Sequence, residues 1–257
     1  MSFLEFIKNI QDKQADALNM PSLPKEFILK SVVDSNLNNH IVAHFEPDSP
    51  LSEQYRRLRE NLKTIRKKEK LQTIAVTSST KEEGKSITSL NLAVTLAKDV
   101  DCKSVLLVDC DLRRGMLDVS LDLNLKVGLS DYLFLGADVE SILYKTKIDK
   151  LTLMPRGKIA NDPAELLGSN RMEALLEKIR KNFDYIILDT PPVIAVADSG
   201  IVCAQADGVI MVIRAGKTQR GIVKHSTELL EQSKAKLLGY VLTHIEYPIP
   251  EAIYRYV

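Results

Sequence analysis

Short apolar runs alternate with helical patterns through most of this 257-residue chain, and this alternation constrains its fold more than any other feature. Several runs are apolar on both faces, as strands covered on both sides of a sheet must be. The predicted strands are residues 73–78, 104–109, 151–155, 184–189, 208–214 and 237–244. The predicted helices are residues 85–98, 163–181 and 217–234, with shorter ones at 129–142 and 196–205. This order predicts an α/β fold, in which helices cover both faces of a mostly parallel twisted sheet.

The pattern is interrupted near both ends of the chain, which suggests three parts. Residues 1–45 are predicted to be an N-terminal extension, with a possible short amphipathic helix at 3–18. Residues 20–50 carry prolines and polar residues without a clear period, and we expect an extended connection there. The main domain is predicted to cover residues 46–245, and residues 246–257 form a tail.

A further helix is predicted to begin at Ser49-Pro50, because a capping hydroxyl followed by proline is typical of a helix start. Its apolar residues recur at helical spacing and are Tyr55, Leu58, Leu62 and Ile65. The other face is charged, since residues 53–70 contain eight Lys or Arg and three Glu.

Composition excludes several classes of protein. Thirty-five basic and 34 acidic residues leave a formal net charge of +1, so the whole chain has no general attraction for nucleic acid. The cysteines Cys102, Cys110 and Cys203 lack metal-binding spacing, and we expect reduced thiols in a cytoplasmic protein. No signal peptide and no run of about 18 uncharged apolar residues is present, which predicts that the sequence does not span a membrane.

The segment TSSTKEEGKS, residues 77–86, ends as a phosphate-binding loop does. Backbone N–H groups and the following helix can hold phosphates, Lys85 can neutralise them, and Ser86 can ligate Mg²⁺. The usual spacing asks for glycine where this chain has Ser79, and a phosphate-free turn is the alternative interpretation. If Glu82 needs a positive φ, we expect a strained and slow site. The predicted nucleotide contacts in the loop are Thr80, Lys81, Glu82, Glu83, Gly84, Lys85, Ser86 and Ile87.

Two further strand ends carry carboxylates. VLLVDCDLRRG ends a predicted strand in Asp109 and Asp111, and DYIILDTPPV ends another in Asp189. Each alone is also consistent with a polar turn or a helix cap. In a parallel sheet, however, ligands bind at the carboxyl ends of the strands. The three motifs together therefore predict a site for a nucleoside triphosphate and Mg²⁺.

These motifs resemble those of the bacterial tyrosine kinases (BY-kinases) that govern capsule and exopolysaccharide assembly, within the MinD/ParA-like P-loop ATPases. NDPAELLGSNRM and DGVIMVIRAGKT add to the resemblance, which covers roughly residues 45–257. The resemblance implies ATP and Mg²⁺ as cofactors and protein tyrosines as acceptors. It assigns catalysis to Lys85, Asp109 and Asp111, and metal binding to Ser86, Asp111 and Asp189. Which of Asp109 and Asp111 is the base stays open.

Two further marks of the family occur in the chain. Glu53, Arg56 and Arg59 match a Glu-x-x-Arg-x-x-Arg motif, which in the family contacts the next subunit of a ring-like homo-oligomer. A solvated charged face is the alternative. The C-terminal segment EYPIPEAIYRYV holds the predicted autophosphorylation sites Tyr247, Tyr254 and Tyr256, although packing of these aromatic residues on the domain is possible.

The chain also departs from the family. Gly115 stands where DLRR is usually followed by proline, and Thr243-His244 stands where related folds place Asn-Asp. Arg214 is the candidate adenine contact, with an ordinary surface arginine as the alternative. Because no membrane span is predicted, the resemblance implies a separate transmembrane adaptor of the polysaccharide chain-length-determinant type, which recruits the protein to the inner face of the membrane.

Two other functions compete with a kinase. A MinD- or ParA-like ATPase switch has a lysine where this loop has Thr80, and the nearest lysine, Lys81, is off by one position. A catalytically weak ATP-binding scaffold of a polysaccharide export machine is the second. The lysine offset, the Glu53-Arg56-Arg59 helix and the tyrosine-containing tail all favour the kinase.

Overall fold

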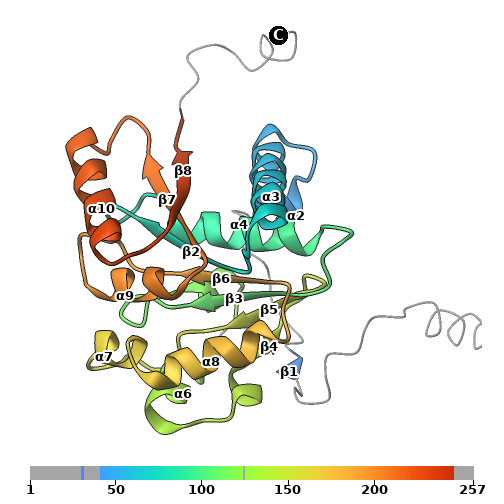
Figure 1. Cartoon of the computed structure of the whole chain (residues 1–257). Coiled ribbons are helices and arrows are strands. Elements are labelled where there is room, and N and C mark those ends of the chain that lie inside the picture. Colours follow the sequence, from blue (N-terminus) through green and yellow to red (C-terminus); the bar gives the residue numbers. More distant parts are fainter. Residues whose placement is uncertain (1–29, 32–40, 124, 246–257) are drawn as a thin grey trace, which may run out of the picture.

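The computed structural model describes residues 30–31, 41–123 and 125–245 of the chain (Figure 1). In these residues the strands form an eight-stranded sheet in the order β1-β4-β5-β3-β6-β2-β7-β8. All neighbouring strands are parallel except β4 and β5. The predicted fold class is confirmed. The strands are β1 Lys30–Ser31, β2 Thr73–Ser78, β3 Val105–Asp109, β4 Tyr144–Lys145, β5 Leu151–Met154, β6 Tyr185–Asp189, β7 Gly208–Arg214 and β8 Leu237–Thr243.

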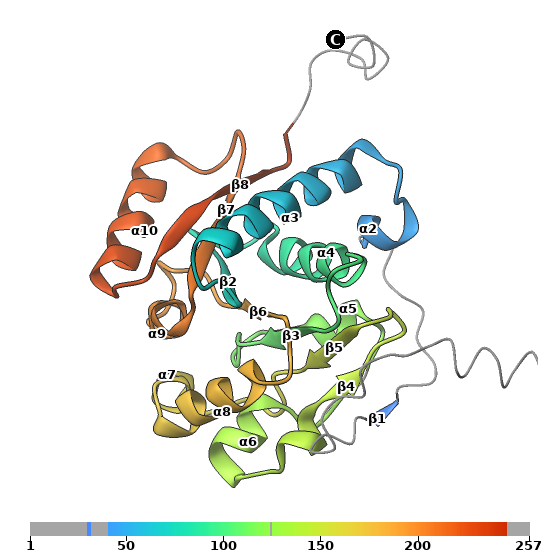
Figure 2. The same ribbon diagram turned by 45° about the vertical axis from the view of Figure 1, so that its right-hand side comes forward.

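Helices cover both faces of the sheet (Figures 1 and 2). One hydrophobic core joins the sheet to α2, α3, α4 and α5, and the other joins it to α6 through α10. Every residue of the central strands β2, β3 and β6 is buried, which explains why their sequences are apolar on both faces. The helices are α2 Val42–Phe45, α3 Pro50–Lys68, α4 Lys85–Ala97, α5 Leu117–Ser120, α6 Leu129–Leu135, α7 Pro163–Leu167, α8 Asn170–Arg180, α9 Asp198–Gln205 and α10 Arg220–Gln232, with a 3₁₀ helix at Val139–Ile142.

The helix predicted from Ser49-Pro50 is confirmed as α3. Ser52 N donates a hydrogen bond of 3.2 Å to Ser49 Oγ, and Pro50 occupies the first turn. Tyr55 and Leu62 are buried against α4 and the sheet. The capping hydroxyl and the apolar spacing therefore define this helix locally.

Two predicted helices are shorter than their periodicity suggests. The pattern at 163–181 is split into α7 and α8 around Gly168-Ser169, because Ser169 adopts an extended backbone. The pattern at 129–142 ends as an α-helix at Leu135, because Gly136 takes a left-handed conformation with φ 72°. At Gly136 the glycine allows the chain to leave the helix without a steric cost.

The connection predicted at residues 20–50 contains a short helix that the sequence did not indicate. In α2, Ala43 is buried and its N–H donates to Asn91 Oδ1 at 3.0 Å, which attaches this segment to α4. The short strands β1 and β4 were also missed, since two residues give no periodic signal. The predicted helix at 3–18 and the tail at 246–257 lie outside the described residues, and the three-part division of the chain stays a prediction. None of the helices in the described residues has the length and apolarity needed to cross a bilayer.

Candidate active site

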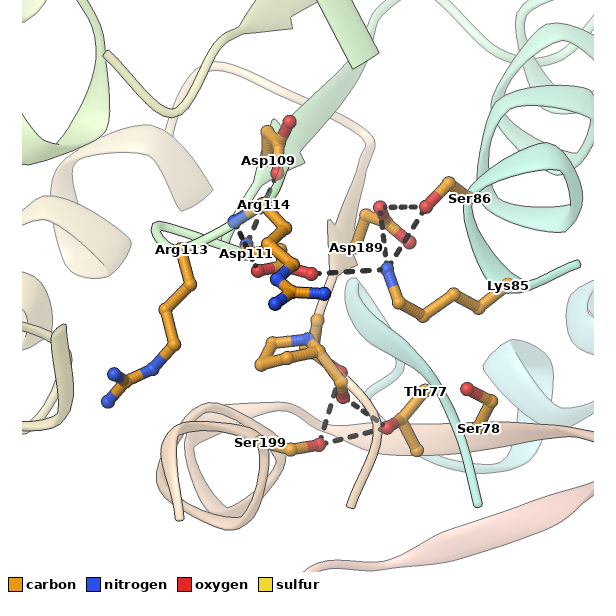
Figure 3. A network of polar contacts seen from close by, with 12 residues as sticks. Thr77, Ser78, Lys85, Ser86, Asp109, Asp111, Arg113, Arg114, Asp189 and Ser199 are labelled. Carbon is orange, nitrogen blue, oxygen red and sulfur yellow. Dashed lines mark hydrogen bonds and ion pairs between the residues drawn. The ribbon is translucent and has the colours of Figure 1, made fainter. Parts of the chain in front are cut away.

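The predicted site residues meet at the carboxyl ends of the central strands (Figure 3). Asp109 and Asp189 are paired in register where β3 and β6 end, and the loop after β2 leads into α4 beside them. Parallel neighbouring strands end at the same edge of the sheet, so motifs about 25 and 80 residues apart in sequence form one cluster.

The loop between β2 and α4 contains two left-handed residues. Gly84 has φ 88° at the N-cap of α4, where glycine is free of Cβ strain. Glu82 has φ 62°, a conformation that costs a residue with a Cβ about 1 kcal/mol or more. The backbone at Glu82 therefore adopts a conformation that favours glycine, although the sequence has a residue with a Cβ at this position. The Glu82 side chain is 79% exposed and lies 3.8 Å from Lys217 Nζ.

Glu83 behaves differently from its neighbour. Glu83 is buried, whereas the Glu82 side chain is exposed. Its carboxylate accepts hydrogen bonds from Thr80 N at 3.0 Å and from the Thr218 hydroxyl. Its carbonyl oxygen accepts one from Thr243 Oγ1 at 2.7 Å. Glu83 thus fastens the loop to the segment that follows β7 and to the last residue of β8, which gives Thr243 a structural role.

Lys85 lies among carboxylates. Its Nζ is 3.6 Å from Asp111 Oδ2 and 3.5 Å from Asp189 Oδ2, and it donates to Ser86 Oγ at 3.1 Å (Figure 3). Burial lowers the pKa of Lys85, but the negative charges of Asp189, Asp111 and Asp109 outweigh this effect and raise it. The ammonium group therefore stays charged at neutral pH.

Asp189 is fully buried and accepts two hydroxyl hydrogen bonds from α4. Ser86 Oγ donates to Oδ2 at 2.7 Å, and Ser89 Oγ donates to Oδ1 at 2.8 Å. The sequence analysis missed Ser89. Its position one helical turn after Lys85, on the face of α4 that meets the sheet, is the signal that would have found it.

Asp109 and Asp111 occupy different environments. Asp109 is fully buried, and its carboxylate accepts hydrogen bonds from Asp111 N at 3.2 Å and Leu117 N at 3.1 Å. Burial, followed by the charge of Asp189, raises the pKa of Asp109 to about 8. A Cβ at Gly115 would lie 2.1 Å from Asp109 Oδ1, so the packing at this position requires glycine. Asp109 is buried beneath the loop and holds its backbone through these hydrogen bonds, whereas Asp111 lines the cavity.

The cavity above these residues has a volume of about 580 Å³. Asp111, His244 and the Pro191-Pro192 pair also line it. Thr80 and Glu83 do not line the cavity. The Glu83 side chain is turned into the loop, where it accepts a hydrogen bond from Thr80 N. The predicted nucleotide contacts that line the cavity are Lys81, Glu82, Gly84, Lys85, Ser86, Ile87 and Arg214.

The two arginines after Asp111 point to different places. Arg113 donates to both carboxylate oxygens of Asp198, at 2.8 and 3.1 Å, and its guanidinium turns away from the other aspartates (Figure 3). Arg114 lies beside Asp111, and its backbone N–H donates to Asp111 Oδ1 at 2.9 Å. Arg113 therefore fixes the loop to α9, and the Arg114 side chain lines the cavity.

The predicted interface residues lie on α3, outside the cavity. Arg56 donates to Glu53 Oε2 at 2.7 Å within the helix. Arg59 Nε is 3.3 Å from Asp99 Oδ2, which ties it to the end of α4 in the same chain. The three side chains thus have partners inside the chain, and their role between subunits stays a prediction.

Comparison with known proteins gives consistent relatives. A family model described as an AAA domain matches residues 71–237. Tyrosine-protein kinase YwqD of Bacillus subtilis is 36% identical over 219 residues, which is 83% of this chain and 92% of that protein. Tyrosine-protein kinase CpsD of Streptococcus agalactiae is 35% identical over 75% of this chain and 83% of that protein.

Solved structures give the same result. The chimerical protein CapA2B2 superposes with a TM-score of 0.77 at 30% identity, over 92% of this chain and 99% of that chain. The kinase domain of the Escherichia coli tyrosine kinase ETK gives a TM-score of 0.76 at 28% identity, over 84% of this chain and 86% of that chain. MinD of Pyrococcus horikoshii, complexed with Mg-ADP, gives 0.58 at 21% identity over 71% of this chain and 75% of that chain, which shows a shared fold alone.

Proposed function

The chain belongs to the bacterial tyrosine kinases of the capsule and exopolysaccharide type, and from this premise we propose that it transfers the γ-phosphate of ATP to Tyr247, Tyr254 and Tyr256 of its own tail. The observation that carries the proposal is the position of Lys85 between Asp111 and Asp189 on one wall of a cavity. Phosphoryl transfer depends mainly on positioning and on neutralising charge, and this wall supplies both.

The nucleotide is proposed to lie along the loop and α4. The backbone N–H groups of residues 81–86 hold the phosphates, and Lys85 turns from the carboxylates to the β- and γ-oxygens. The adenine is assigned to the end of the cavity that Arg214 and His244 line. Contact with Thr80 and Glu83 is limited to their backbone, since their side chains do not line the cavity.

The oxygen ligands present suit Mg²⁺. Within the described residues, no group of three or more His, Cys, Asp or Glu side chains is arranged to hold a metal. Mg²⁺ at a phosphate site needs only one or two carboxylates, because phosphate oxygens and waters complete its shell. Ser86, Asp189 and Asp111 are the proposed protein partners, and the ion would neutralise charge that develops on the phosphate oxygens.

Asp111 is the proposed base. It lines the cavity, whereas Asp109 is buried behind the loop and hydrogen-bonded to the N–H groups of Asp111 and Leu117. Asp111 is therefore positioned to accept the proton of an incoming tyrosine hydroxyl. Asp109 acts as a positioning residue that holds the backbone of Asp111.

The test is incubation of the purified full-length chain with ATP and Mg²⁺, followed by mapping of phosphotyrosines by mass spectrometry. We expect phosphate on the tail tyrosines, and none after Tyr247, Tyr254 and Tyr256 are changed to Phe. ATP binding without transfer would instead support a scaffold. ADP release without phosphotyrosine would support an ATPase switch.

Assembly and recruitment form a second part of the proposal. We assign the Glu53-Arg56-Arg59 face of α3 to a ring-like homo-oligomer, and a transmembrane adaptor to recruitment at the inner face of the membrane. Arg56→Ala should reduce the oligomer mass in sedimentation without unfolding the chain. Arg59→Ala should also lower stability, because Arg59 pairs with Asp99. An unchanged mass in both variants would contradict the interface.

A further inference from the structure

A second hollow of about 520 Å³ opens at the carboxyl end of the sheet, as the first cavity does, between α6, α7 and the loop that follows β5. We propose that it is a subsite for the apolar and basic residues that follow an acceptor tyrosine, and that its occupant is the tail of this chain, residues 246–257. The inference rests on the proposed function and names the part of the acceptor that the enzyme recognises.

The two hollows are lined by the loops that follow two neighbouring strands, β3 and β5. β5 is the parallel neighbour of β3, so the loops that follow these strands lie side by side. Arg113 lines the first hollow, and Asp162 lines the second. The hydrogen bond to Asp198 raises the pKa of Arg113, and burial lowers it. The charges of Asp162 and Asp111 raise this pKa further, so Asp162 lies close enough to Arg113 to interact with it electrostatically. Since neighbouring strands are about 4.8 Å apart, a peptide that leaves Asp111 reaches the second hollow within a few residues.

Exposed apolar side chains surround the second hollow. Phe134 and Leu135 on α6 are 72% and 63% exposed, and Ile159 on the loop after β5 is 70% exposed. Large apolar side chains that cluster on a surface mark binding sites, because water leaves such a surface favourably when a partner covers it. The residues that would fill the hollow are therefore apolar.

The hollow is held in shape by buried hydrogen bonds. The Asp131 carboxylate accepts from Gly128 N at 2.9 Å and from Lys158 N at 3.4 Å. Ser130 Oγ donates to the Lys158 carbonyl at 2.7 Å. Gly157 has φ 80°, and a Cβ there would meet the Asp131 carboxylate. A preformed site loses little conformational entropy on binding.

The charges of the wall favour a basic residue in the peptide. Asp162 and Glu165 are exposed at the rim, and Lys158 Nζ lies 3.9 Å from Asp131. In the tail, Tyr254 is followed by Arg255, Tyr256 and Val257, and Tyr247 is followed by Pro248 and Ile249. The tail therefore supplies apolar residues after its tyrosines, and one arginine that complements the acidic rim.

The test uses the full-length chain with Tyr247, Tyr254 and Tyr256 changed to Phe, and the synthetic peptide EYPIPEAIYRYV as acceptor. In this background, Phe134→Ser with Ile159→Ser should raise the KM for the peptide about tenfold and change kcat less than about twofold. ATP affinity should not change. Val100→Ser is the matched control, because Val100 is an apolar residue exposed at the opposite end of the sheet. An unchanged KM in the double variant, or an equal rise in the control, would overturn the subsite.

A charge exchange tests the acidic rim independently. Glu165→Lys should raise the KM for the natural peptide and lower it for a peptide in which Arg255 is Glu. Equal changes for both peptides would contradict the rim assignment. If the unaltered enzyme phosphorylates neither peptide nor tail, the proposed function itself fails, which is a different result from an unchanged KM.

Discussion

Charged residues are crowded together at the carboxyl end of the parallel sheet and paired with partners at its amino end. At the carboxyl end, Asp109, Asp111 and Asp189 gather around Lys85, and Glu82 adopts a left-handed backbone. This end carries an excess of negative charge and local strain, both of which lower the stability of the folded state.

At the amino end, Asp207 and Asp99 each have several matched partners. Asp207 accepts hydrogen bonds from Gln72 N at 2.9 Å, Thr73 N at 2.8 Å and Arg180 Nη1 at 2.8 Å. Asp99 pairs with Lys63 at 2.7 Å. Ionised carboxylates with such partners stabilise the fold.

The difference shows that one sheet supports both stability and function by separating them in space. The amino end fixes the strands, and the carboxyl end holds carboxylates whose charge a bound cation would neutralise. Substitutions that destroy activity should therefore differ from those that destabilise the protein, and matched pairs of variants can test this separation.

The largest effect on activity is expected when Lys85 at the carboxyl end is compared with Lys63 at the amino end. Lys85→Met should lower the rate of tyrosine phosphorylation about 10³-fold, because it removes the charge that stabilises the transferred phosphate. Lys63→Met should leave the rate unchanged and cost at most about 1 kcal/mol of stability, since the Lys63–Asp99 pair is partly exposed. Phosphorylation kinetics and denaturant unfolding measure the two effects. A comparable loss of rate in both variants would contradict the separation.

A glycine pair comes next. Gly115→Ala should lower the rate about 10²-fold, because the new Cβ displaces Asp109 and with it the backbone of Asp111. In Gly208→Ala, at the amino end, the Cβ meets the flexible end of the Leu238 side chain, and the expected cost is about 1 kcal/mol of stability with activity retained. Normal activity in Gly115→Ala would show that Asp109 does not position Asp111.

The third prediction concerns pH. Burial raises the pKa of Asp207, but the Thr73 N–H, Arg180 and the Gln72 N–H outweigh burial and hold it below the usual value of 3.8. A lowered pKa in the folded state means that the charged form stabilises the protein above about pH 4 and that this contribution disappears as the pH falls through the folded pKa.

Asp207→Asn should therefore cost about 2 kcal/mol at pH 7, and the difference from the unaltered protein should shrink below about pH 4. Denaturant unfolding at pH 7, 5 and 3 measures it, with phosphorylation at pH 7 as the control for the site. A constant difference over this range would show that the charge of Asp207 does not contribute.

The smallest effects are expected for two left-handed residues. Glu82 at the site and Lys234 before β8 have φ 62° and 63°. Changing either one to Gly should raise the free energy of unfolding by about 0.5–1 kcal/mol, because glycine accepts this backbone without strain. Glu82→Gly should also tighten ATP binding about twofold by removing a carboxylate beside the cavity, an effect that weakens with salt. Lys234→Gly should leave ATP binding unchanged, and identical binding in both variants would show that Glu82 does not face the nucleotide.

Much of this arrangement was predictable from the sequence. The alternation of apolar strands and helices predicted β2, β3, β5, β6, β7 and β8, because burial on both faces leaves a local mark on each strand. The comparisons confirm the kinase family that the motifs at Lys85, Asp109 and Asp189 indicated. α2 and β4 escaped notice because elements of two to four residues carry no period, and their burial depends on distant partners.

The sequence by itself determined the class of fold, the family and the set of charged residues that meet at the carboxyl end of the sheet. Only the tertiary structure separated the two aspartates after β3, turned Glu83 into the loop, and directed Arg113 toward Asp198. The physical reason is the range of the interactions. Strand and loop motifs are recorded in neighbouring residues, whereas burial and hydrogen bonding of a carboxylate depend on groups that are up to 135 residues away in the chain.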